Sequence, residues 1–76
     1  MAKYEDSNWA IRMWQNAHCN VKLGDPFETE YFDNVSKLEV RVTQLQKGGR
    51  FNYLWWGEFD SDSGEFAIKL GDWWRD

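Results

Sequence analysis

A chain of 76 residues with a single cysteine must hold its fold together by packing alone. A domain of this size buries only about 60% of the surface that its unfolded chain exposes, and Cys19 has no second cysteine for a disulfide. Six Trp, five Phe and three Tyr offer compensation, because each large ring can bury about 150–250 Å². We therefore expect one compact domain over residues 1–76, with most of its rings in one core.

The balance of charge narrows the choice of partner. Thirteen acidic and nine basic side chains give a formal net charge of −4. This charge disfavours non-specific binding to nucleic acid or to an anionic membrane, and it suits another protein with a basic surface. No apolar run approaches the roughly 20 residues of a membrane span, and residues 1–6 lack the apolar stretch of a signal peptide. We expect a cytoplasmic protein with no membrane association and no direct nucleic-acid binding.

Two helices are predicted in the N-terminal half. Apolar residues recur at three- and four-residue spacing between residues 9 and 17, and Ser7 or Asp6 can cap a helix that begins there. We predict this helix over about 7–18. Pro26 follows an Asp and precedes Glu28, a pattern typical of a helix N-terminus. It predicts a short second helix over about 26–32.

Three strands are predicted in the C-terminal half. Leu38, Val40 and Val42 alternate with polar residues, which indicates a half-buried strand over about 37–46. Gly48-Gly49 predicts a hairpin into an aromatic strand over about 50–59, and the turn residues 60–64 lead to a third strand over about 65–70. The predicted fold is α+β, with both helices on one face of a three-stranded antiparallel meander.

The neighbouring residues Trp55 and Trp56 suggest where a partner binds. Successive side chains of a strand point to opposite faces. On the middle strand, the side that carries Tyr53 and Trp55 is the more apolar one, so we predict that Trp55 faces the core. Trp14 belongs to the apolar stripe of the first predicted helix, and we predict that it also faces the core. The other set then lies on the outer face, and an aromatic centre with a charged rim is typical of a protein-binding hot spot. The predicted partner-binding residues are Trp56, Leu54, Glu58, Glu39, Arg41 and Lys69. In the alternative arrangement, Trp73 and Trp74 fold back and cover Trp56.

No catalytic or metal-binding pattern emerges from the sequence. His18 and Cys19 are the only residues of their types, and neighbouring positions on a helix point in different directions, so the thiol lacks a general base. Asp60, Asp62 and Glu65 resemble part of a calcium-binding loop, which needs Gly at its sixth position and Glu at its twelfth. Counted from Asp60, Gly64 is at the fifth position and the twelfth is Gly71, so the pattern does not match. We predict a protein that is not an enzyme and that has no cofactor and no metal site.

The general character of the chain resembles phage-encoded inhibitors, anti-CRISPR proteins among them, which are often tiny, acidic and aromatic. The resemblance implies an inhibitor that blocks a basic nucleic-acid-binding surface of its target, and it assigns no residues. We therefore predict a small, acidic, non-enzymatic protein-binding module.

Two other functions stay open. Exposed Trp rings could serve a small-ligand or carbohydrate-binding domain, and aromatic stacking is common in binders of single-stranded nucleic acid. Acidic residues clustered on one surface would favour the protein-binding module. A pocket lined by several Trp would favour the ligand-binding domain, and a stripe of Lys and Arg would favour the nucleic-acid binder.

Overall fold

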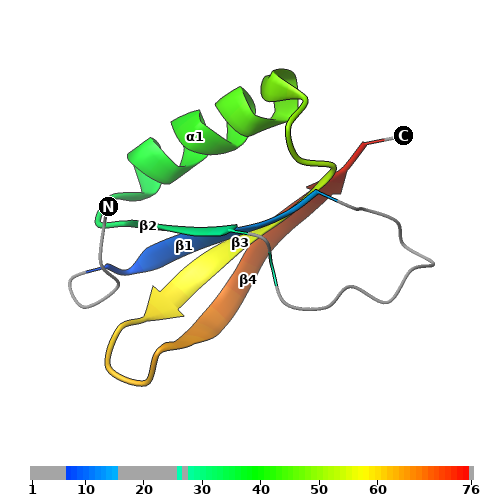
Figure 1. The fold of residues 1–76 in the computed structure, drawn as a ribbon. Helices are drawn as coiled ribbons and strands as arrows, with labels where there is room; N and C mark the ends of the chain where they lie inside the picture. Colours follow the sequence, from blue (N-terminus) through cyan, green and yellow to red (C-terminus); the bar gives the residue numbers. More distant parts are fainter. Residues whose placement is uncertain (1–6, 16–25, 27, 76) are drawn as a thin grey trace.

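The structure is a computed structural model that describes residues 7–15, 26 and 28–75. The described part contains β1 (Trp9–Trp14), β2 (Glu28–Phe32), α1 (Val35–Gly48), β3 (Tyr53–Asp60) and β4 (Glu65–Trp74). The strands form one antiparallel sheet in the order β2-β1-β3-β4, and α1 lies across one side of it (Figure 1). The α+β class and the antiparallel sheet are confirmed, with four strands and one helix in place of three strands and two helices.

Both helices predicted in the N-terminal half are wrong. Residues 9–14 form β1, and residues 28–32 form β2. The segment 9–14 fits a strand as well as a helix, because its large apolar residues Trp9, Ile11 and Met13 also alternate. Its place in the sheet decides between the two, since β1 pairs with β2 on one side and with β3 on the other. The rest of the first predicted helix, from residue 16 onward, lies outside the described residues.

The strand predicted over 37–46 is the helix α1. The strand pattern relied on Val40, which is 59% exposed. The helical pattern relies on Leu38, Val42 and Leu45, which are all buried and fall on one face at spacings of four and three residues. The alternation ends at Val42, whereas the helical spacing continues to Leu45. A helix therefore buries more of the apolar residues of this segment than a strand would.

The ends of α1 are specified by local chemistry. The side chain of Asn34 accepts hydrogen bonds from the backbone N–H groups of Ser36, at 2.7 Å, and Lys37, at 3.4 Å. At the other end, Gly49 has a φ of 80°, the left-handed conformation in which glycine ends many helices. The Gly48-Gly49 pair is therefore a helix terminator rather than the predicted hairpin turn.

The C-terminal hairpin is confirmed. β3 and β4 are antiparallel neighbours joined by a turn over residues 61–64. β4 extends to Trp74, beyond the predicted end at residue 70. The pairing shifts register twice, between Trp56 and Gly57 and between Glu58 and Phe59. No helix in the described part of the chain is long and apolar enough to cross a membrane.

The core lies between α1 and one face of the sheet. Its buried residues are Ile11, Met13, Leu38, Val42, Leu45, Phe51 and Leu54. Trp9, Phe32, Trp56 and Trp73 pack against this cluster and are partly buried. The predicted choice of faces on the middle strand is thus inverted, because Leu54 is 0% exposed and Trp56 lies on the same side as the helix.

Trp56 is also packed against the neighbouring strand. It pairs with Gly71 across β3 and β4, and its indole ring covers that glycine so closely that an added Cβ would lie 2.8 Å from Cζ2 of the ring. Gly71 therefore has to lack a side chain for the ring to adopt this position. Trp56 is a structural residue of the helix-side face and does not lie on the opposite, outer face as predicted.

We predict that Leu38→Ala destabilises the fold by about 2–5 kcal/mol, because it leaves a cavity under α1. The matched control is Val40→Ala, on the same helix but 59% exposed, which should change the free energy of unfolding by less than about 0.5 kcal/mol. Urea unfolding of both variants measures the difference. Equal effects would show that α1 does not pack through the Leu38 side.

Candidate functional site: an aromatic sheet face

The side of the sheet that faces away from α1 is rich in aromatic rings. Leu54 points into the core, so Tyr53 and Trp55 point the other way. Residues paired across strands share a face, which places Arg12 beside Trp55 on this side. The rings on this side, called here the aromatic face, are Trp14, Tyr31, Tyr53, Trp55, Phe59, Phe66 and Trp74. Phe59 is buried within the layer.

At one end of the aromatic face, three rings form a row across β1, β3 and β4. The ring centroids of Trp14 and Tyr53 are 5.0 Å apart, and those of Tyr53 and Trp74 are 6.3 Å apart. Trp74 is 44% exposed. The sequence analysis placed Trp14 in the core, but it is only partly buried and belongs to this row.

At the other end, the rings pack around Phe66. Its centroid lies 4.4 Å from that of Trp55, with the two rings perpendicular, and 5.4 Å from that of Phe59. Phe59 in turn contacts Tyr31 on β2 at 5.2 Å. Edge-to-face contacts of this kind stabilise aromatic pairs. The predicted core residue Trp55 therefore packs in an aromatic layer on the opposite side of the sheet from the core.

A cation lies within this layer. The guanidinium carbon of Arg12 is 4.6 Å from the ring centroid of Phe66 and 5.9 Å from that of Trp55. Both distances are within the range of a cation–π interaction. Arg12 as a whole is partly buried.

Lys69, one of the predicted partner-binding residues, lies on the aromatic face. Its Nζ donates a hydrogen bond to Asp72 at 2.6 Å, which raises the pKa of the lysine. The neighbouring Tyr53 has a raised pKa because its phenol is partly desolvated and because the negative charge of Asp72 opposes ionisation. Lys69 and Asp72 thus form a paired, locally neutral unit beside the aromatic row.

The structure does not bring the other predicted residues together. Leu54 is fully buried and Trp56 packs on the helix side. Glu58 is exposed on β3 but shares the side of Trp56, and Glu39 is exposed on α1 rather than on a strand. These residues do not form the continuous outer patch that the sequence analysis predicted.

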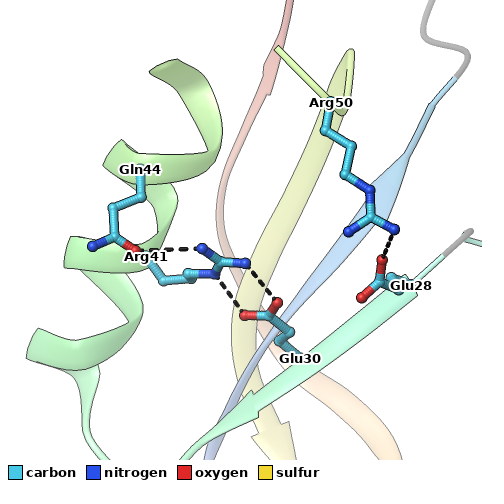
Figure 2. Close-up of polar contacts among 5 residues, drawn as sticks. All are labelled: Glu28, Glu30, Arg41, Gln44 and Arg50. Atoms are coloured by element: carbon cyan, nitrogen blue, oxygen red, sulfur yellow. Dashed lines mark hydrogen bonds and ion pairs between the residues drawn. The ribbon is translucent and has the colours of Figure 1, made fainter. Parts of the chain in front are cut away.

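Arg41, the remaining predicted residue, is used in a structural contact (Figure 2). Its Nε and Nη2 atoms donate hydrogen bonds to Glu30 at 2.8 and 2.9 Å, and its Nη1 donates a longer one to Gln44 at 3.4 Å. The bonds to Glu30 raise the pKa of the guanidinium. Nearby, Arg50 Nη2 lies 2.8 Å from Glu28 Oε2. These ion pairs tie α1 and the segment after it to β2.

Acidic side chains gather on the β3–β4 hairpin, which extends away from α1 (Figure 1). Glu58, Asp60, Asp62 and Glu65 are all exposed. None of them forms an ion pair with another described residue. Asp60 and Glu65 are paired directly across the strands, where like charges repel. We call these four residues the acidic hairpin.

One groove and no metal-binding cluster are found among the described residues. An open groove of about 410 Å³ lies on the helix side and is lined by Phe32, Ser36, Lys37, Val40, Arg41 and Gln44, with no Trp. No group of three His, Cys, Asp or Glu residues in the described part could hold a metal ion. His18 and Cys19 lie outside the described residues.

Comparison with protein-family models, with curated proteins and with solved structures finds no match to the chain. Functional inference therefore rests on the geometry of this fold. The sequence analysis did not identify Arg12, Phe66 and Trp74 as residues of a shared surface. The alternation of Trp9, Ile11 and Met13 with Arg12 was the available signal, since it places Arg12 on the side of β1 opposite to the core.

We predict that Tyr53 is a late-titrating tyrosine. Its pKa is raised from 10.0 in the folded protein, so folding favours the neutral phenol. The associated stability is fully present below pH 10 and is lost as the pH rises through the folded-state pKa. Alkaline absorbance titration should show that Tyr53→Phe removes the late phenol ionisation. The variant should also lose less stability than the parent above pH 10, and an unchanged late ionisation would contradict the assignment.

Proposed function

We propose that the protein is a non-enzymatic binding module that contacts another protein through the aromatic face. The observation that carries the proposal is the layer of aromatic rings on the side of the sheet that α1 does not cover. Trp74 is exposed and most of the other rings are partly buried, so the layer presents apolar surface to solvent, and such surface on a small protein often marks a binding site. Trp, Tyr and Arg, which occur together here around Trp55 and Arg12, are the residue types enriched at binding hot spots.

The acidic hairpin adds exposed negative charge at the end of the sheet, with Glu58, Asp60 and Glu65 on the side opposite the aromatic face. Its four carboxylates and the net charge of −4 suit a partner that is basic where it meets the hairpin. Such charges act mainly on the rate and orientation of association. An inhibitor that occludes a basic nucleic-acid-binding surface is the specific form of this proposal, with the hairpin as the element that approaches that surface.

The arrangement supports this function better than the alternatives. A binder of nucleic acid needs several cations along the phosphate backbone. On the aromatic face, the described cations are Arg12 and Lys69, and Lys69 is neutralised by Asp72. A carbohydrate site is favoured by a Trp-lined pocket, whereas the groove described above lies on the helix side and has no Trp.

We predict that Trp74→Ala weakens partner binding by at least about 2 kcal/mol, roughly thirtyfold in affinity, if this ring is a hot spot. The reason is its position at the exposed end of the ring row. The immobilised protein would first be used to capture its partner from a lysate. The affinity of the captured partner for each variant would then be measured by titration. Val40→Ala is the matched control, because Val40 is an exposed apolar residue on α1, across the sheet.

Both variants need melting curves to separate folding from binding. Retention of the partner by Trp74→Ala together with its loss from Val40→Ala would place the binding surface on the helix side and reject the aromatic face. Trp55 lies on the same face as Trp74, so we expect Trp55→Ala to weaken partner binding as well.

For the acidic hairpin, we predict that Glu65→Gln folds at least as stably as the parent but binds a basic partner more slowly. Removing the charge relieves its repulsion with Asp60, worth about 0.2–1 kcal/mol. It also weakens electrostatic steering, so the association rate constant should fall and should depend less on salt. Stopped-flow association at several salt concentrations measures this effect, and an unchanged rate at low salt argues against a role for the hairpin.

A further inference from the structure

Arg12 differs from the other three arginines in how its charge is used. Arg41 and Arg50 form ion pairs with glutamates of β2. Arg75 donates hydrogen bonds to the side chain of Asn52 and to the backbone carbonyl of residue 51, both at 3.1 Å. The guanidinium of Arg12 has no hydrogen bond and no ion pair to any described residue, and its contacts are with two aromatic rings.

Within the described part of the chain, the hydrogen-bonding capacity of Arg12 is not used. A guanidinium is planar and carries five N–H donors, which point outward within its plane. The rings of Phe66 and Trp55, with centroids at 4.6 and 5.9 Å, attract the positive charge but offer no acceptor of ordinary strength. The side chain therefore lies against the aromatic face, and no described residue accepts a hydrogen bond from its donors.

We propose that Arg12 anchors the partner by binding a carboxylate, from an Asp or Glu side chain that has apolar neighbours. This inference rests on the proposed function of the aromatic face and names what that face recognises. A carboxylate can accept two parallel hydrogen bonds from a guanidinium, and such pairs are among the strongest hydrogen bonds in proteins. The rings restrict Arg12 beforehand, so less side-chain entropy is lost when the pair forms.

The charge on the aromatic face supports an anionic group at its centre. Lys69 and Asp72 neutralise each other, which leaves Arg12 as the unpaired charge among the described residues that line this face. Three acids of the acidic hairpin, Glu58, Asp60 and Glu65, lie on the helix side of the sheet, which is the side opposite Arg12. A single carboxylate fits this surface better than a nucleic-acid phosphate. A nucleic acid is a polyanion, and on this face it would find one unpaired cation on a protein of net charge −4.

A random dodecapeptide library displayed on phage provides the probe. Peptides selected on the wild-type protein would be synthesised, and their dissociation constants would be measured against wild type, Arg12→Gln, Arg12→Lys and Lys47→Gln. We expect the selected peptides to share an Asp or Glu between apolar residues. Arg12→Gln should weaken binding at least about tenfold, and Arg12→Lys should restore it only in part, because Lys lacks the planar fork.

Lys47→Gln is the matched control, because it makes the same change in net charge at the last turn of α1. It should leave affinity within about twofold of wild type. A second measurement needs no variant of the protein. In the ¹⁵N–¹H spectrum, the Nε–H resonance of Arg12 should shift when a selected peptide is added, and it should not shift with the same peptide carrying Gln in place of its acid.

Several results would overturn the inference. Peptides without an acidic residue, a wild-type affinity in Arg12→Gln, or an unshifted Nε–H signal would reject Arg12 as a carboxylate anchor. If Trp55→Ala still abolished binding in those cases, the aromatic face would stand as the binding surface. If neither Trp55→Ala nor Trp74→Ala changed peptide binding, or if no peptide could be selected, the result would count against the aromatic face as the binding surface. Arg12-dependent binding of a twelve-residue oligothymidylate would instead identify the anion as phosphate.

Discussion

The packing of α1 on one side of the sheet determines on which face each aromatic ring of the described strands lies. Leu38 and Val42 reach down from the helix to a cluster that includes Ile11 and Leu54. The described part of the chain has one helix, and it covers one face of the sheet. Because strand residues alternate between faces, that contact assigns Trp56 to the core side and Trp55 to the aromatic face.

Local chemistry specified part of this fold. The C-terminal hairpin was predictable, because β-forming aromatic residues flank a turn segment at 60–64 and no competing helical period runs through them. The segments 9–14 and 35–48 were not, since each satisfies both the helical and the alternating pattern of apolar residues. Pairing with two neighbouring strands settles the first segment, and burial of Leu45 settles the second. Both are long-range effects that no short window of sequence contains.

The candidate site depended on the same missing information. The adjacent pair Trp55-Trp56 correctly indicated rings on opposite faces, yet the choice of the outward ring required the position of the helix. Arg12 was not among the predicted partner-binding residues, because its segment was predicted to be a helix and not a strand of the sheet. Its significance comes from Phe66, which is distant in sequence but lies against it on the finished sheet. The acidic hairpin, in contrast, follows directly from the spacing of acids around the turn.

The central claim is that the helix packs on the face of Leu54 and leaves the face of Trp55 as the surface available to a partner. Nuclear Overhauser effects between core methyl groups and indole protons test this claim most directly. The account predicts cross-peaks from the methyl groups of the Leu38 cluster to Trp56 and Trp73, with none from Leu38 or Val42 to Trp55. Strong cross-peaks from the helix methyl groups to Trp55, with none to Trp56, would contradict it.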